Sequence, residues 1–243
     1  MTAVLIHELG GSSASWDGVV ARLAGALRFI RYDQRGHGAS SCSGAPYAFA
    51  EHTADLAAVL DAAAVTEPCW LIGAAAGAAI AVDFAARYSE RVMGIVLCAP
   101  ALDVDRARRD YLSNRADVAT RRGMSEVVDL ALAQSWPADL RDDGAAFAGY
   151  RARMLASDPR GYALANLALC DIDLGGALAA LRCPCLFLAG ERDPLRPPAH
   201  VAAQAARVAG GAFAIVTAGH LMAVQRPGAV AAEIAAFAAE HRA

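Results

Sequence analysis

The sequence predicts an α/β protein: a mostly parallel sheet flanked by helices on both faces, with an inserted helical cap. Two observations carry this prediction. Short apolar runs alternate along the chain with longer amphipathic stretches, which is typical of strands joined by crossover helices. The segment 101–181 breaks this alternation, and its roughly eighty residues are helical in pattern and too many for a loop.

The predicted strands are the short apolar runs, each ended by Gly, Pro, Asp or His. They cover 3–6, 27–32, 70–72, 92–98, 185–189 and 213–217. The amphipathic stretches between them predict helices over 16–25, 51–64, 76–88, 199–208 and 227–241. We therefore expect one structural domain, with a core formed by 1–100 and 182–243 and a cap formed by 101–181.

The composition excludes several classes of function. The chain has 243 residues, a formal charge of −3 and 56% hydrophobic residues, which is enough to bury the core of one soluble domain. It has no basic run, so the electrostatic footprint of a nucleic-acid-binding protein is absent. All 22 basic residues are arginine, and without lysine neither a Schiff base nor a P-loop phosphate site can form.

The sequence also predicts a cytoplasmic protein without a membrane anchor. The first residues carry no basic segment of a signal peptide, and no apolar run approaches the ~18 residues of a membrane span. The six cysteines are scattered, and the closest pair, Cys183 and Cys185, has the spacing of neither a zinc knuckle nor a redox motif. We expect reduced thiols, and either a monomer or a homodimer.

A tight turn follows the third predicted strand and opens a helix. Residues 73–77 read GAAAG, and a turn with glycine at both ends between strand and helix is the geometry of a nucleophile elbow, G-x-S-x-G. The tip of the turn is Ala75, which has no nucleophilic atom. Ala75 is either an engineered replacement of serine or the residue that the gene encodes. The run lacks the middle glycine of G-x-G-x-x-G, so no nicotinamide or flavin cofactor is expected.

Three further segments complete a catalytic arrangement in chain order. Asp193 follows the fifth predicted strand and His220 follows the sixth, which is the acid-then-histidine order of hydrolytic triads. We expect His220 to act as the base and Asp193 to orient it. After the first strand, residues 7–12 read HELGGS and resemble an oxyanion loop, with the N–H groups of Leu9 and Ala76 as donors.

From end to end, the chain resembles the α/β-hydrolase superfamily. The run YDQRGHG at 32–38 matches its Y-D-x-R-G-H-G turn, and the segments 154–162 and 171–173 look like those of 3-oxoadipate enol-lactone hydrolases. The resemblance implies cofactor-free hydrolysis of a lactone or ester through a Ser-His-Asp triad under a helical lid. The chain departs from this pattern at Ala75, at Glu8 in the oxyanion loop, and in lacking the usual N-terminal hairpin.

Glu8 and the cap supply the remaining candidates. Glu8 is either a second carboxylate that positions water or a proton in the pocket, or a solvated loop residue bonded to a backbone N–H. Trp136, Arg153 and Tyr162 are the predicted substrate-binding residues of the cap. If the substrate carries a carboxylate, arginine is its natural bidentate partner, although a cap arginine can equally belong to a solvated helix face.

These observations lead to one main functional hypothesis and two alternatives. The main hypothesis is hydrolysis of a small lactone or ester, in which His220 and Asp193 activate water if Ala75 is the natural residue. The first alternative is non-hydrolytic catalysis, such as proton transfer or C–C cleavage, on the same scaffold. The second is a catalytically silent protein that binds a small molecule.

Overall fold

The computed structural model describes residues 1–25 and 27–241, so residues 26, 242 and 243 of the predicted core segments lie outside it. Its centre is a six-stranded sheet of order β2-β1-β3-β4-β5-β6 in which every neighbouring pair is parallel. The strands are β1 (Thr2–Ile6), β2 (Arg28–Arg31), β3 (Cys69–Ala74), β4 (Val92–Cys98), β5 (Cys185–Gly190) and β6 (Ala212–Val216). The predicted fold class is confirmed, and each predicted strand is present with small shifts at its ends.

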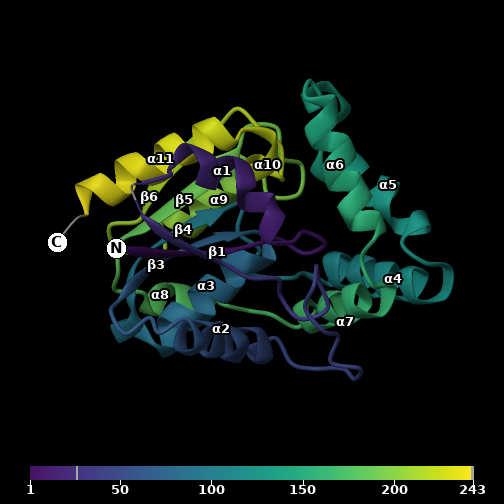
Figure 1. The fold of residues 1–243 in the computed structure, drawn as a ribbon, viewed down its shortest axis with the longest axis horizontal. Helices are drawn as coiled ribbons and strands as arrows, with labels where there is room; N and C mark the ends of the chain where they lie inside the picture. The colour runs from purple at the N-terminus through teal and green to yellow at the C-terminus, as the bar shows by residue number, and fades with distance from the viewer. Residues whose placement is uncertain (26, 242–243) are drawn as a thin grey trace.

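Helices cover both faces of this sheet (Figure 1). One face packs against α1 (Asp17–Arg22), α10 (Met222–Gln225) and α11 (Pro227–Glu240). The other packs against α2 (Ala50–Ala62), α3 (Ala76–Arg87), α8 (Gly175–Ala180) and α9 (Pro198–Ala205). Short 3-10 helices occur at Ser13–Trp16, Ser89–Arg91 and Ala138–Leu140. With both faces covered, the strands read as continuous apolar runs, which is the pattern that allowed their prediction.

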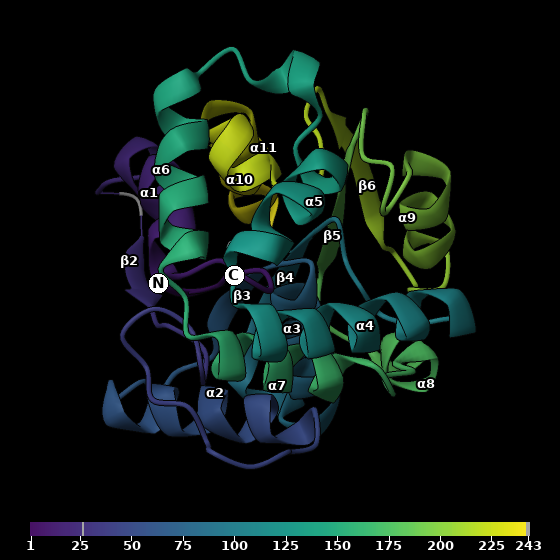
Figure 2. The ribbon, with the colours of Figure 1, turned by 90° about the vertical axis from the view of Figure 1, so that its right-hand side faces the viewer.

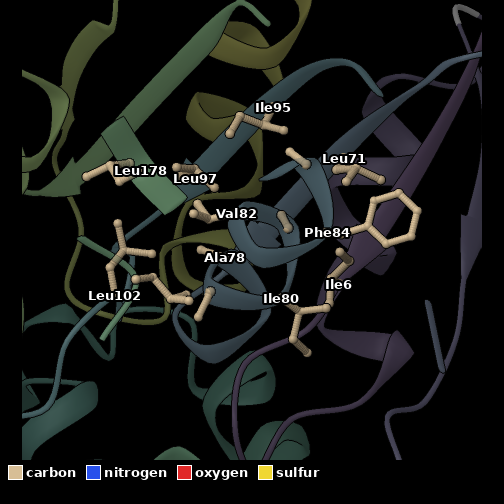
Figure 3. Close-up of a cluster of buried hydrophobic side chains, with 14 of the residues drawn as sticks. Ile6, Leu71, Ala78, Ile80, Val82, Phe84, Ile95, Leu97, Leu102 and Leu178 are labelled. Atoms are coloured by element: carbon tan, nitrogen blue, oxygen red, sulfur yellow. The ribbon is translucent and has the colours of Figure 1, made fainter. Parts of the chain in front are cut away.

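The central strand β3 shows how the two cores are divided. All six of its residues are buried, and successive side chains point to opposite faces because the period of a strand is two. Leu71 belongs to the core on the α3 side, whereas Trp70 and Ile72 belong to the core on the α11 side. Figure 3 shows the first of these cores, in which Leu71 and Leu97 of the sheet surround side chains of α3.

The cap is inserted between β4 and β5 and lies beyond the carboxyl ends of the strands (Figures 1 and 2). It consists of α4 (Arg106–Arg122), α5 (Ser125–Ser135), α6 (Gly144–Leu155) and α7 (Pro159–Leu169). Asp105, Asp143 and Asp158 cap α4, α6 and α7 by accepting hydrogen bonds from backbone N–H groups of the first turns. The predicted cap segment 101–181 also contains α8, but Leu178 of α8 packs into the core beneath the sheet.

Two further features bear on the setting of the protein. Among the described residues, no helix combines the length and the apolar character that crossing a membrane requires. All six cysteines are free thiols, and four of them are buried.

Candidate active site

The turn between β3 and α3 has the backbone of a nucleophile elbow. Ala75, at its tip, has φ 48° and ψ −108°, a conformation that costs a residue with a side chain about 1–3 kcal/mol. The chain holds it there because the Ala75 N–H donates to the Cys98 carbonyl and the Ala75 carbonyl accepts from the Ala101 N–H. A Cβ at Gly77 would overlap the carbonyl oxygens at the end of β1, so glycine is required at that position.

We expect Ala75→Gly to leave the free energy of unfolding unchanged or to raise it by up to about 1 kcal/mol, because glycine adopts a positive φ at little cost. The matched control is Ala79→Gly, which removes a buried methyl group four residues later in α3. It should lower the free energy of unfolding by at least about 1 kcal/mol, since its backbone is helical. Urea denaturation followed by circular dichroism measures both. Equal destabilisation of the two variants would show that the elbow is unstrained.

The candidate oxyanion donors lie next to this turn. In the sheet, Ile6 at the end of β1 pairs with Gly73 of β3, so the loop after β1 runs beside the elbow. Ala76 is the first residue of α3, where a backbone N–H has no partner within the helix. The Leu9 N–H also makes no hydrogen bond within the part of the chain that the structure describes. Both residues line the same cavity.

Two buried histidines hold the loop after β1, the predicted oxyanion loop, in place. The Gln34 N–H donates to Nε2 of His7 at 2.9 Å, and the Gly10 N–H donates to Nε2 of His37 at 3.0 Å. Burial lowers the pKa of each histidine from 6.5 to about 4. Both rings are therefore neutral near pH 7 and can accept these hydrogen bonds. Their role is to position the loop.

The structure brings His220 and Asp193 together. They follow the adjacent strands β6 and β5, and Nδ1 of His220 lies 2.8 Å from Oδ2 of Asp193. Oδ1 of Asp193 accepts hydrogen bonds from the N–H groups of Leu195 at 2.8 Å and Arg196 at 3.1 Å. Burial opposes ionisation of Asp193, but the charge of His220 and these donors outweigh it and lower the pKa of the carboxyl. With Nδ1 donating to Asp193, Nε2 of His220 is the nitrogen that can take a proton.

Glu8 is part of the cavity wall and not a solvated loop residue. It is 3% exposed, and its Oε1 accepts hydrogen bonds from the hydroxyls of Ser15 at 2.7 Å and Tyr150 at 2.8 Å. Tyr150 lies on α6, so this carboxylate connects the oxyanion loop to the cap. Burial and the neighbouring Glu8 raise the pKa of the Tyr150 hydroxyl, which keeps it a donor.

The elbow, the loop after β1 and His220 meet at one cavity between the carboxyl ends of the strands and the cap. Its empty volume is about 690 Å³, including the part open to solvent. The core contributes the predicted Glu8, Leu9, Ala75, Ala76 and His220 to its wall. In open parallel sheets, ligands bind at the carboxyl ends of the strands, where loops from several strands converge. No cluster of three or more His, Cys, Asp or Glu side chains among the described residues is arranged to hold a metal ion.

The structure places the three predicted cap residues outside the cavity wall. Trp136 is buried in the interior of the cap, where its Nε1 donates to the Leu140 carbonyl at 2.9 Å. Tyr162 is also buried and belongs to the same cluster of buried side chains as Trp136. Arg153 is exposed, with its guanidinium 5.8 Å from the centroid of the Tyr150 ring.

The cap lines the cavity instead with residues that the sequence analysis did not single out. Arg108, Tyr111 and Arg115 face the cavity from α4, and Arg196 faces it from the loop after β5. The first three are spaced by three and four positions, which places them on one face of a helix. That spacing was readable in the sequence, but a charged helix face is equally typical of a solvated surface.

A parallel sheet with an elbow after a central strand, an acid and a histidine after later strands, and a helical cap defines an α/β-hydrolase. Within this class, the chain belongs to the family described as serine aminopeptidase, S33, whose model matches residues 1–218. The resemblance to enol-lactone hydrolases is confirmed by the relatives.

Three relatives illustrate the similarity. A protein of Pantoea ananatis provisionally named carbamate hydrolase RutD is 28% identical over 233 residues, covering 93% of this chain and 84% of its own. The 3-oxoadipate enol-lactonase 2 of Acinetobacter baylyi is 23% identical over 228 residues, covering 92% of this chain and 83% of its own. The crystal structure of the enol-lactonase from Burkholderia xenovorans LB400 matches with a TM-score of 0.93 and 27% identity, covering 98% of this chain and 91% of that one. The chain is therefore a hydrolase of the esterase and lactonase type.

Proposed function

We propose that the protein hydrolyses a small lactone or ester by direct attack of a water molecule that His220 activates. The observation that carries this proposal is the 2.8 Å hydrogen bond between His220 and Asp193 beside an elbow whose tip, Ala75, has no nucleophile. A catalytically silent binding protein has no need of an imidazole oriented in this way. The names of the relatives support an ester or lactone as the bond that is cleaved.

The geometry supports the following steps. The substrate carbonyl lies above Ala75, with its oxygen toward the N–H groups of Leu9 and Ala76. Nε2 of His220 removes a proton from water as the water oxygen bonds to the carbonyl carbon, and the carbonyl electron pair moves to the oxygen. Collapse of this tetrahedral intermediate breaks the bond to the leaving oxygen, which receives the proton from His220. Asp193 stabilises the imidazolium in between.

The expected rate is modest but measurable. General-base catalysis contributes about 10²- to 10⁴-fold, and an oxyanion hole with substrate binding retains about 10³- to 10⁴-fold without the triad. An enol-lactone suits such a site because its leaving group is a stabilised enolate. An alkyl ester, with a poorer leaving group, should react far more slowly.

The test compares this protein with Ala75→Ser on activated aryl esters and enol-lactones, following initial rates and the mass of the intact protein. We expect turnover by the parent without any covalent adduct, and an acyl adduct only in Ala75→Ser. No turnover by the parent, together with turnover and an adduct in Ala75→Ser that His220→Ala abolishes, would instead identify a disabled serine hydrolase. No turnover by either protein would favour the silent binder.

A further inference from the structure

Three arginine side chains in the cavity wall, Arg108, Arg115 and Arg196, form no ion pair with a carboxylate of the described residues. Nine other arginines of the described residues pair with an aspartate, as Arg151 does with Asp129, but none of those nine lines this cavity. Three cations that face one cavity repel one another unless a ligand supplies negative charge.

Neutral groups hold two of these cations in position. Nε and Nη2 of Arg115 donate to Oδ1 of Asn166 at 2.8 and 2.6 Å, and the guanidinium lies 5.2 and 5.4 Å from the ring centroids of Tyr111 and Tyr162. The guanidinium of Arg108 lies 4.9 Å from the centroid of the Tyr111 ring and makes no hydrogen bond with the described residues. Stacking orders an arginine without neutralising it, so both charges remain available to a ligand.

Arg196 is fixed by backbone oxygens. Its Nη1 donates to the Leu195 carbonyl at 3.1 Å and its Nη2 to the Asp103 carbonyl at 3.2 Å. Its Nε is buried and has no hydrogen-bond partner in the described part of the chain. A buried donor without a partner is costly, and an oxygen of a bound anion would satisfy it.

The electrostatics of the cluster agree with this arrangement. Burial, together with repulsion from Arg115 and Arg196, lowers the pKa of Arg108 to about 10. Asp103, Asp105 and Asp193 lie near enough to Arg196 to raise its pKa, although none of them forms an ion pair with it. No carboxylate of the described residues has this effect on Arg108. The protein itself therefore leaves positive charge at this end of the pocket.

We propose that the substrate carries two negative charges on its part remote from the scissile bond, as two carboxylates or as one phosphate group. Nearby aspartates partly compensate Arg196, so a single carboxylate bound bidentately to Arg108 or Arg115 would leave the other of these two cations uncompensated. Arg108, with all its donors free, is the principal partner, and Arg115 and Arg196 flank it. The position of the scissile bond rests on the proposed function, whereas the anion site rests only on the arginines.

The test measures binding by isothermal titration calorimetry at low salt, with acetate, succinate and inorganic phosphate as probes. We expect succinate or phosphate to bind at least about 10-fold more tightly than acetate, because each charge-assisted hydrogen bond contributes roughly a 10- to 100-fold factor. Tighter binding of succinate indicates a dicarboxylate substrate, and tighter binding of phosphate indicates a phosphate-bearing one. Equal binding of acetate and both dianions, or no binding of any probe, would overturn the proposal.

Variants locate the site. Arg108→Gln and, separately, Arg196→Gln should weaken binding of the preferred dianion roughly 10- to 100-fold. Arg106→Gln, an exposed position two residues earlier, is the matched control for net charge and should leave binding unchanged. Binding that survives both site variants contradicts the proposal. Since binding needs no turnover, dianion binding without hydrolysis would refute only the proposed function, and hydrolysis of neutral esters without anion binding would refute only this inference.

Discussion

Replacing His220 with alanine is expected to lower kcat/KM for an activated lactone by about 10²- to 10⁴-fold. The imidazole is the group in the cavity wall that Asp193 orients through a 2.8 Å hydrogen bond, and in the proposed mechanism it takes the proton of water beside the candidate donors Leu9 and Ala76. The oxyanion donors remain in the variant, so activity should fall to the level that they support and not to zero. Initial rates over a range of substrate concentrations separate this effect on kcat from an effect on binding.

Two further variants make this prediction specific. Asp193→Asn keeps the shape of the side chain but favours the wrong tautomer of His220, so it should lower kcat strongly with little change in KM. His241→Ala, at the end of α11 and outside the cavity wall, is the control and should keep the parent rate. If His220→Ala retained full activity and Glu8→Gln lost it, water would be activated by Glu8 and the proposed mechanism would be wrong.

The sequence predicted the sheet and the elbow because both leave local signals. Buried parallel strands read as apolar runs, and two glycines bracket the turn: Gly73 is required by backbone contacts within the turn and Gly77 by contacts with the end of β1. The order of apolar runs along the chain also predicted that Asp193 follows the fifth strand and His220 the sixth. Their hydrogen bond could then be expected, because the carboxyl ends of neighbouring parallel strands lie side by side.

The cap was harder to predict because its helices pack on one another as well as on the core. An aromatic residue there, such as Trp136, can face the cap interior as readily as the pocket, and amphipathic patterning does not distinguish the two. Arg108 and Arg115 were not predicted to line the pocket, because charged residues on one face of a helix usually indicate that the face is exposed to solvent. The predicted cap segment 101–181 also includes α8, which covers the sheet beside α3.

Acidification is expected to destabilise the fold through its buried histidines. Burial lowers the pKa of His7 and of His37 to about 4 and that of His52 to about 3, against 6.5 in the unfolded chain. Above pH ~6.5 these rings are neutral in both states. As the pH falls from about 6.5 to about 4, the unfolded chain binds protons that the folded chain cannot, so the free energy of unfolding falls. Each pKa difference of one corresponds to about 1.4 kcal/mol, so His7 alone contributes a loss of about 3 kcal/mol.

Urea denaturation at about pH 7 and about pH 4.5 measures this loss, and His37→Gln assigns it. Glutamine can still accept the hydrogen bond from the Gly10 N–H but does not titrate, so the variant should lose less stability on acidification than the parent. His241→Gln, which does not touch the oxyanion loop, should behave like the parent. A free energy of unfolding that stays constant over this range would mean that the histidines titrate freely in the folded protein. The oxyanion loop, which depends on His7 and His37 as neutral acceptors, would then be held by other contacts.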